Sequence, residues 1–260
     1  MQAAGRAQTA PASEGAIPLR WTAMETLIVV GVRTLGRAIA LHFAAQKWRV
    51  VCASRTRDEV DRLARDVDAA GGEGIPVVCD LTDRASLDAL VREGDRVDLC
   101  IAAQTAGGRF GARPLIEIDD EELERGFQSY LRGTWNLLKT VGPRLLAQGS
   151  GTFLQIGTSS GVRTKDGFAA LGAVQHGLRA LVQVAAREWR SSGVHVAYLP
   201  IDGAIDSEKT QAWIAKSGAD RAIPQLEIAH ACAYLHRQDR RAWTHELVLR
   251  PTGTDWSAPT

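Results

Sequence analysis

The stretch TLIVVGVRTLGRAIALHFAAQ, residues 26–46, places an apolar run, a turn with two glycines and a helical pattern one after another. TLIVV is rich in β-branched and other apolar residues, which favours a buried strand. In LGRAIALHFAAQ the apolar residues recur every three or four positions, which is typical of a helix. Strand, turn and helix in this order predict the first βα unit of an α/β domain.

The same order of elements recurs along the chain. Further strands are predicted at WRVVCAS (48–54), GIPVVCD (74–80), RVDLCIAA (96–103), GTFLQIG (151–157), VHVAYLP (194–200) and THELVLR (244–250). Helices are predicted at 57–70, 84–93, 119–148, 171–189, 208–216 and 224–236. Because the strands are apolar without alternation, they indicate a mostly parallel sheet covered by helices on both faces. We therefore expect a doubly wound α/β fold.

Composition limits the classes of function. The chain has 260 residues, 45% of them hydrophobic, and its 31 basic and 30 acidic residues give a formal net charge of +1. This charge does not indicate nucleic acid or an anionic membrane as a partner. A small-molecule substrate or a second copy of the chain is the expected partner. The four cysteines are widely separated and lack the spacing of metal ligands, so no metal site is predicted and buried, reduced thiols are expected.

The two ends differ from the middle of the chain. Residues 1–24 are rich in small residues and lack the apolar run of a signal peptide, so they are predicted to be a mobile tail. No segment reaches the run of about 18 apolar residues that would span a membrane. The predicted domain covers residues 25–250, residues 251–260 form a C-terminal tail, and the protein is expected to be cytoplasmic.

The turn after the first strand predicts a dinucleotide site. In parallel α/β folds, ligands bind beyond the carboxyl ends of the strands. Gly31 permits a tight exit from the strand, and Gly36 permits a close approach at the start of the helix. Free N–H groups and the helix dipole favour a phosphate there.

The end of the second strand bears on the choice between the two nicotinamide cofactors. Ser54 and Arg55 stand where an acidic residue would bind the adenosine ribose of NAD. A guanidinium from Arg55, joined by Arg33 of the first turn, suits a 2′-phosphate, so NADP(H) is preferred over NAD(H). The alternative is that Arg55 and Arg57 are solvated loop charges.

After the third strand, Asp80 lies where an adenine amino group could be bound. Alternatively, this acidic segment serves the next helix, with Asp83 as its cap.

Taken together, these segments resemble the short-chain dehydrogenase/reductase family from Thr26 to Arg250. VVGVRTLGRAIA resembles the family's TGxxxGxG turn, and CDLTD its DxTD-like segment; GTFLQIGTSSG resembles the serine-bearing strand and LRALVQVAARE the catalytic helix. The resemblance implies a single-domain Rossmann fold and a nicotinamide cofactor bound by residues including Leu35, Leu81 and Ala102. It also implies a homodimer or homotetramer built on the long helices at about 119–148 and 168–191.

The sequence departs from the family's catalytic pattern. The positions of the family's Asn, Ser, Tyr and Lys fall on Tyr130, Thr158, Leu171 and Gln175, with Ser159 beside the second of these. Leucine cannot transfer a proton, and glutamine has no charge with which to lower the pKa of an acid. Thr158 keeps a hydroxyl that could orient a carbonyl, and Gln175 could still bind ribose. The family's NNAG segment reads AAQT here, and the glycine turn is one residue short.

Several residues are expected around the substrate. Phe168, Leu171, Asp202 and Trp213 fall on the substrate side, the last of them in a predicted substrate loop at about 203–222. Tyr130 either supplies the missing proton or packs into the space left by the altered pair.

Three hypotheses follow for the function. The first is an atypical NADP(H)-dependent reductase or dehydrogenase acting on a carbonyl or alcohol, with Thr158, Ser159, Tyr130 and Gln175 as its catalytic residues. The second is a non-redox cyclase, dehydratase or isomerase on the same scaffold. The third is a non-catalytic protein that binds a dinucleotide or a partner subunit, or that has lost cofactor binding.

Overall fold

The first βα unit forms where the sequence predicts it. The computed structural model describes residues 24–92, 96–106, 110 and 112–254. The predicted N-terminal tail, apart from Met24, and residues 255–260 of the predicted C-terminal tail lie outside the described residues. Strand β1 (Thr26–Val30) is followed by helix α1 (Thr34–Ala44).

The other elements follow in the predicted alternation. They are β2 (Arg49–Ser54), α2 (Arg57–Ala69), β3 (Glu73–Val78), α3 (Arg84–Arg92), β4 (Leu99–Ala102), α4 (Asp120–Gly126), α5 (Gly133–Gln148), β5 (Gly151–Thr158), α6 (Ala169–Trp189), β6 (Val194–Ile201), β7 (Ala204–Ile205), α7 (Gln211–Ser217), β8 (Ala222–Ile223) and α8 (Gln225–His236). The two helices predicted late in the chain are therefore confirmed as α7 and α8.

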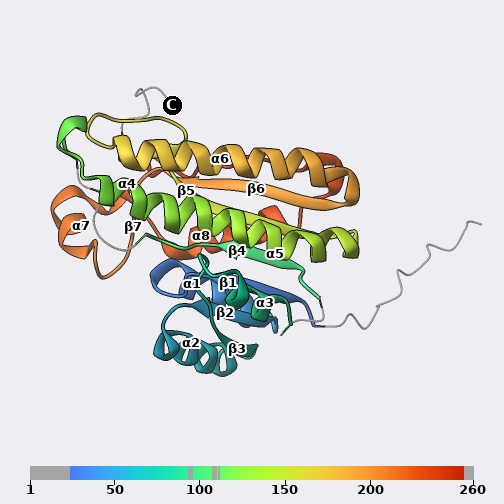
Figure 1. The fold of residues 1–260 in the computed structure, drawn as a ribbon. Coiled ribbons are helices and arrows are strands. Elements are labelled where there is room, and N and C mark those ends of the chain that lie inside the picture. The colour runs from blue at the N-terminus through green and yellow to red at the C-terminus, as the bar shows by residue number, and fades with distance from the viewer. Residues whose placement is uncertain (1–23, 93–95, 107–109, 111, 255–260) are drawn as a thin grey trace, which may run out of the picture.

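The sheet has the strand order β3-β2-β1-β4-β5-β6, and all of its neighbouring strands are parallel (Figure 1). Strand order reverses between β1 and β4. In such a sheet the ligand crevice lies at the carboxyl ends of the strands beside this reversal. The predicted doubly wound α/β fold is confirmed.

The strand predicted at residues 244–250 is only partly formed. His245 accepts a hydrogen bond from the Tyr198 N–H at 2.8 Å, and Leu249 accepts one from the Asp202 N–H at 2.8 Å. These contacts make isolated parallel bridges with β6 and no regular strand. The segment therefore lies along the edge of the sheet beside β6 but does not form the continuous hydrogen-bond pattern of a strand.

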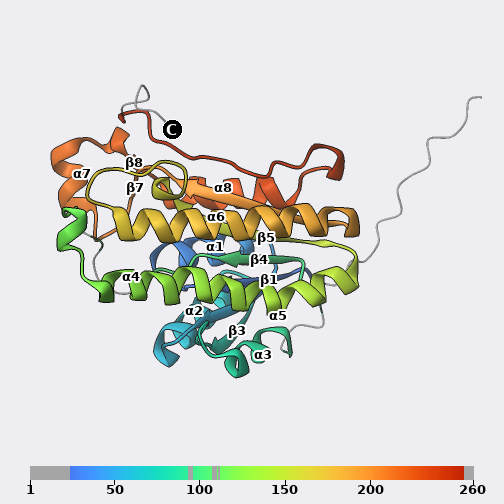
Figure 2. The same cartoon turned by 45° about the horizontal axis from the view of Figure 1, so that its top comes forward.

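Two hydrophobic cores lie on the two faces of the sheet. Leu27 and Val50 pack with α1, α2 and α8 on one face. Ile28 and Val51, their neighbours in the strands, pack with α3, α5 and α6 on the other. Successive strand residues point to opposite faces, so continuous apolar strands require burial on both sides. Figure 2 shows α5 and α6 running side by side across one of these faces.

The long helical region predicted at 119–148 contains a local irregularity. A π-helical turn, Phe127–Arg132, joins α4 to α5 and carries Tyr130. Gly126 and Gly133 flank it, and a Cβ on either would approach a neighbouring side chain to within 3.1–3.3 Å. These glycines let the turn pack closely against its surroundings. Apolar periodicity does not distinguish a π turn from an α-helix.

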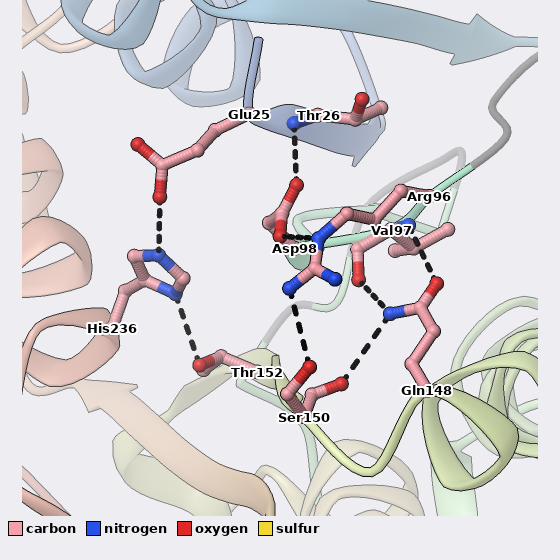
Figure 3. Close-up of polar contacts among 9 residues, drawn as sticks. All are labelled: Glu25, Thr26, Arg96, Val97, Asp98, Gln148, Ser150, Thr152 and His236. Atoms are coloured by element: carbon pink, nitrogen blue, oxygen red, sulfur yellow. Dashed lines mark hydrogen bonds and ion pairs between the residues drawn. The ribbon is translucent and has the colours of Figure 1, made fainter. Parts of the chain in front are cut away.

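A polar network ties together the amino ends of the strands (Figure 3). Buried Asp98 accepts hydrogen bonds from the Thr26 N–H at 2.9 Å and from the Arg96 guanidinium. His236 of α8 lies between Thr152 and Glu25, with its Nδ1 3.0 Å from the Thr152 hydroxyl. These side chains fix β1, β4 and β5 at the edge opposite the expected ligand crevice.

The thiols agree with a further expectation. All four cysteines are free and buried, as predicted. No helix within the described ranges is long and apolar enough to cross a membrane.

Candidate active site at the carboxyl edge of the sheet

The glycine turn after β1 brings three backbone segments into close contact. Gly31 has φ +89°, and a Cβ there would lie 2.6 Å from the Ala103 carbonyl oxygen. A Cβ on Gly36 would lie 1.8 Å from the Gly31 carbonyl oxygen. Both positions therefore require glycine, and the turn seats the start of α1 against the end of β4.

The start of α1 can receive an anion. Arg33 at the N-cap makes no side-chain capping bond, and the first turn contains no acidic residue. Its N–H groups and the positive end of the dipole therefore face the strand ends with no acidic side chain in the first turn of the helix. Leu35 is buried, whereas the Arg33 guanidinium is exposed and lies 3.5 Å from the Thr105 hydroxyl beyond β4.

The end of β2 presents a cation without a partner. Ser54 Oγ accepts a hydrogen bond from the Thr56 N–H at 3.2 Å. Arg57 is paired with Asp61 at 3.5 Å. Arg55 is exposed and has no hydrogen bond or ion pair with the part of the chain that the structure describes. Arg55 is therefore free to bind a phosphate, whereas Arg57 matches the alternative of a surface charge.

The loop after β3 is held by its own acidic residues. Asp80 Oδ1 accepts hydrogen bonds from the Thr82 N–H at 2.9 Å and hydroxyl at 2.8 Å. Asp83 Oδ1 accepts one from the Ala85 N–H at 3.0 Å, which confirms it as a cap of α3. Leu81 is buried, and its carbonyl accepts a hydrogen bond from Asn136 at 2.8 Å.

A chain of polar side chains orders the segment after β4. The Gln104 amide donates to the Thr134 hydroxyl at 2.8 Å, and that hydroxyl donates to Gln155 Oε1 at 2.9 Å. The Gln155 amide in turn donates to the Ala102 carbonyl at 3.1 Å. These residues were not singled out in the sequence, although AAQT shows Gln104 as a polar residue directly after a buried strand.

Thr158 and Ser159 lie half-buried at the carboxyl end of β5. Thr158 Oγ1 accepts a hydrogen bond from the Ser160 N–H at 3.3 Å. The Thr158 hydroxyl is thus held at the strand end, where a bound carbonyl could accept a hydrogen bond from it.

Gln175 lies beneath Thr158 and is fully buried. Its Oε1 accepts hydrogen bonds from the Thr158 N–H and from the Tyr198 hydroxyl, each at 3.4 Å. Its Nε2 is buried and has no hydrogen-bond partner among the described residues. The carbonyl end of this amide is therefore committed to the fold, and only the N–H₂ end remains for a ligand. Leu171, one helical turn before Gln175 on α6, is half-buried and packs against the hydrophobic core between α6 and the sheet.

Tyr198 is a central residue of this site that the sequence analysis did not identify. Its side chain is fully buried, and a Cβ on Gly157 or Gly161 would lie 2.1 or 2.3 Å from its hydroxyl oxygen. Burial raises the pKa of the Tyr198 phenol well above its ordinary value, so the phenol stays protonated near neutral pH. The available signal was a tyrosine within the apolar run VHVAYLP.

Tyr130 projects from the π turn and is 9% exposed. Burial raises the pKa of its phenol, against the opposing effect of a hydrogen bond with the Ala106 backbone. Its ring lies 6.3 Å from that of Phe110. In this structure the phenol is engaged with the segment after β4.

The remaining predicted substrate residues occupy different surroundings. Phe168 is half-buried at the start of α6, and Trp213 on α7 is 45% exposed. Asp202 is buried and paired with two guanidiniums: Arg163 at 2.8 Å and Arg250 at 2.6 Å. Asp202 thus links the end of β6 to the segment after β5 and to the C-terminal segment.

The order of elements and the geometry of the first turn match a known family over nearly the whole domain. The family model described as enoyl-(acyl carrier protein) reductase matches residues 30–250. The chain belongs to the short-chain dehydrogenase/reductase family. Its single-domain Rossmann fold is the one that this family assignment implies.

Three known members place the chain within this family. An uncharacterized oxidoreductase of Listeria monocytogenes is 24% identical over 243 residues, covering 89% of this chain and 98% of that protein. A fatty acyl-CoA reductase of Mycobacterium tuberculosis is 26% identical, covering 84% of this chain and 74% of that protein. The crystal structure of a metagenomic short-chain oxidoreductase in complex with NADP is 26% identical, with a TM-score of 0.72 and coverage of 88% and 97%.

The site can now be compared with the catalytic positions of the short-chain dehydrogenase/reductase family. The structure brings Thr158, Gln175 and Tyr198 into one hydrogen-bonded group at the end of β5. Leu171 and Gln175 lie one helical turn apart on α6, at the positions to which the resemblance assigns the catalytic tyrosine and lysine. The buried phenol of Tyr198 on β6 thus contacts Gln175, while α6 offers no acidic group at the Leu171 and Gln175 positions.

Proposed function

We propose that this protein is an NADP(H)-dependent oxidoreductase that acts on a carbonyl or alcohol group of a small organic molecule. The observation that carries the proposal is the uncapped start of α1, seated on the Gly31 turn and flanked by the exposed cations Arg33 and Arg55. A dinucleotide with an additional phosphate matches this donor set. The NADP complex of the metagenomic relative supports the same choice.

The residues present fit such a cofactor. The first N–H groups of α1 would hold the pyrophosphate, Arg55 with Ser54 the 2′-phosphate, and Asp80 with Leu81 the adenine side. The Gln175 N–H₂, buried without a partner, would donate to a ribose hydroxyl near Ala102. When bound, the nicotinamide supplies or accepts the hydride.

The protein's own groups would orient the substrate. The hydroxyls of Thr158 and Ser159 would donate to the substrate oxygen and hold its carbon toward the cofactor. Phe168, Leu171 and Trp213 offer apolar surface for a partly apolar substrate. The proton would come from Tyr130, once released from the Ala106 backbone, or from water, because neither Leu171 nor Gln175 can supply it.

Arg55→Ala is expected to weaken NADPH binding by about tenfold, because one charge-assisted contact to the 2′-phosphate is lost. NADH binding should change little, since NADH has no phosphate at this position. Titration of the purified protein with each nucleotide, monitored by nicotinamide fluorescence, measures both constants. Arg57→Ala is the matched control, because Arg57 is already paired with Asp61. Equal effects of the two substitutions, or no binding of either nucleotide, would contradict the proposal.

Thr158→Val is expected to lower kcat for carbonyl-dependent NADPH oxidation by about 100-fold, because the substrate oxygen loses an oriented donor. The dissociation constant for NADPH should stay unchanged, since this side chain would contact the substrate and not the nucleotide. Steady-state kinetics with a set of aldehydes and ketones, beside the fluorescence titration, separates the two effects. A loss of NADPH affinity equal to the loss of kcat would argue against this role.

The altered tetrad favours a second candidate, a non-redox enzyme on the same scaffold. Leu171 and Gln175 remove the charged acid–base pair that alcohol dehydrogenation ordinarily uses. Such an enzyme would turn over its substrate with no change in nicotinamide absorbance. A non-catalytic dinucleotide-binding protein would bind NADPH with no turnover in either assay.

The proposal includes a homodimer or homotetramer in the cytoplasm. Figure 2 shows α5 and α6 side by side on one face of the molecule. Trp135 and Val184 on these helices are 47% and 52% exposed, which suits a subunit contact. The expected assembly buries this face between two copies.

A further inference from the structure

A cavity of about 290 Å³ lies away from the candidate active site. It is bounded by the last turns of α6, the first residues of β6 and the segment Trp243–His245. His195 in its wall and Ile201 at the carboxyl end of β6 are six residues apart in a strand, which corresponds to about 20 Å. The cavity therefore lies toward the amino edge of the sheet, remote from Thr158 and the glycine turn.

Contacts among its walls pre-organise the cavity. The rings of His195 and Trp243 stack at 4.8 Å with an interplanar angle of 2°. Gln238 holds the same wall, because its amide donates to the Thr244 hydroxyl at 2.8 Å and its Oε1 accepts from the Thr244 N–H at 2.8 Å. The Trp243 indole donates to the Gln238 carbonyl at 3.3 Å. The aromatic wall is thus fixed without a ligand.

Two arginines supply positive charge at the cavity. Arg187 of α6 and Arg190, directly after that helix, line the cavity. Both are exposed and have no hydrogen bond or ion pair to any described residue. No acidic side chain of the described ranges lines the cavity. The nearby carboxylate of Glu246 is paired with Arg179 at 2.7 Å. The cavity therefore has a net positive charge available to a ligand.

Two histidines in the walls each have one buried nitrogen that makes no hydrogen bond to the described residues. His195 Nε2 donates to the Thr244 carbonyl at 2.9 Å, while its Nδ1 is buried without a hydrogen bond; the Leu235 backbone lies nearby, but not in hydrogen-bonding geometry. His245 Nδ1 lies 3.3 Å from the Val196 carbonyl; its Nε2 makes no hydrogen bond to the described residues but lies 3.8 Å from the Glu246 carboxylate, with which it pairs when protonated. Buried polar atoms without partners are rare in folded proteins and mark a polar requirement that a ligand can satisfy.

We infer that this cavity is a second small-molecule site, which binds a planar aromatic carboxylate. The aromatic body would lie along Trp243, Ala186 and Val196, and the carboxylate would meet Arg187 and Arg190. Guanidinium groups match the planar carboxylate geometry, and an aromatic wall suits a planar body. The inference is independent of the proposed oxidoreductase function, since it shares no residue with the nucleotide and substrate site.

Isothermal titration of the full chain with benzoate, in the presence of saturating NADPH, tests this site. Benzoate is expected to bind saturably, and benzamide, of the same shape without the charge, at least tenfold more weakly. In an Arg187→Gln/Arg190→Gln variant, the affinity for benzoate should fall by about 100-fold, about tenfold for each guanidinium. The control variant Arg62→Gln/Arg65→Gln removes two exposed charges at the same spacing on α2 and should bind benzoate unchanged.

Any of these outcomes would overturn the inference: no benzoate binding, equal binding of benzamide, or equal affinity in the Arg187→Gln/Arg190→Gln variant. Repeating the titration without NADPH separates the sites. Competition between benzoate and NADPH would place benzoate in the nucleotide crevice and also overturn the inference. Absence of NADPH binding alone would count against the proposed function and leave this test intact.

Discussion

Asp202→Asn is expected to lower the free energy of unfolding by about 3 kcal/mol, because it removes the negative charge between two buried guanidiniums. The side chains of Asp202 and Arg250 are each 6% exposed, and that of Arg163 is 12% exposed. Water therefore cannot replace the carboxylate without opening the structure. Urea unfolding at pH 7, followed by circular dichroism, measures the loss.

The matched control for this substitution is Asp239→Asn, which removes the carboxylate of an exposed pair with Arg241. Its unfolding midpoint should remain that of the unaltered protein, because exposed ion pairs contribute little to stability. Equal destabilisation by the two substitutions would show that burial of the Asp202 group is not the cause.

The contribution of Asp202 to the free energy of unfolding should also depend on pH. Burial raises the pKa of this carboxyl, but the hydrogen bonds and charges of Arg163 and Arg250 outweigh burial and hold the pKa below its usual value. Because the pKa is lower in the folded state, the ionised carboxylate stabilises the fold at every pH above its unfolded pKa of about 4. This stabilisation is lost as the pH falls through the folded pKa. The difference between Asp202→Asn and the unaltered protein should therefore be constant between about pH 5 and pH 8 and shrink below about pH 4.

Local pattern was sufficient to predict the fold because each central strand is apolar on both faces and helices such as α1 and α2 show one periodic apolar stripe. TLIVV and LGRAIALHFAAQ illustrate this, since their burial follows from composition and spacing alone. The segment 244–250 shows the limit. Its residues have strand propensity, but it lies at the sheet edge with only β6 beside it, so it makes isolated bridges.

The glycine turn and the strand ends were predictable for a similar reason. Gly31 and Gly36 stand at fixed distances from one strand and one helix, so the close approach could be inferred from neighbouring residues. The sequence left open whether Arg55 binds a phosphate or is a solvated loop charge, because a sequence does not show which arginine pairs with a nearby acid. The structure pairs Arg57 with Asp61 and shows no ion pair between Arg55 and any residue that it describes.

The arrangement beneath Thr158 could not be predicted from the sequence. Gln175 lies on α6 and Tyr198 on β6, and their contact depends on the exact packing of helix against sheet. Glycine at positions 157 and 161 leaves room for the phenol, but the sequence separates these residues by about forty positions from the tyrosine that fills it. No periodic pattern connects them.

Tyr198→Ala is expected to lower the free energy of unfolding by about 3–5 kcal/mol, the usual cost of removing a fully buried aromatic side chain. Tyr198→Phe should cost only about 1 kcal/mol, because it keeps the ring and loses one long hydrogen bond to Gln175. Guanidinium unfolding of both variants measures the difference. Equal losses would mean that the hydroxyl, and not the ring, stabilises this part of the fold.

A double-mutant cycle with Gly157→Ala tests the packing directly. In the unaltered protein the new Cβ would lie 2.1 Å from the Tyr198 hydroxyl oxygen, so overpacking should cost about 1–3 kcal/mol. In the Tyr198→Ala background the same methyl group enters vacated space, and most of that cost should disappear. The two substitutions should therefore be non-additive by at least about 1 kcal/mol. Additive losses would show that Tyr198 and Gly157 do not share this space, and that the support beneath Thr158 comes from elsewhere.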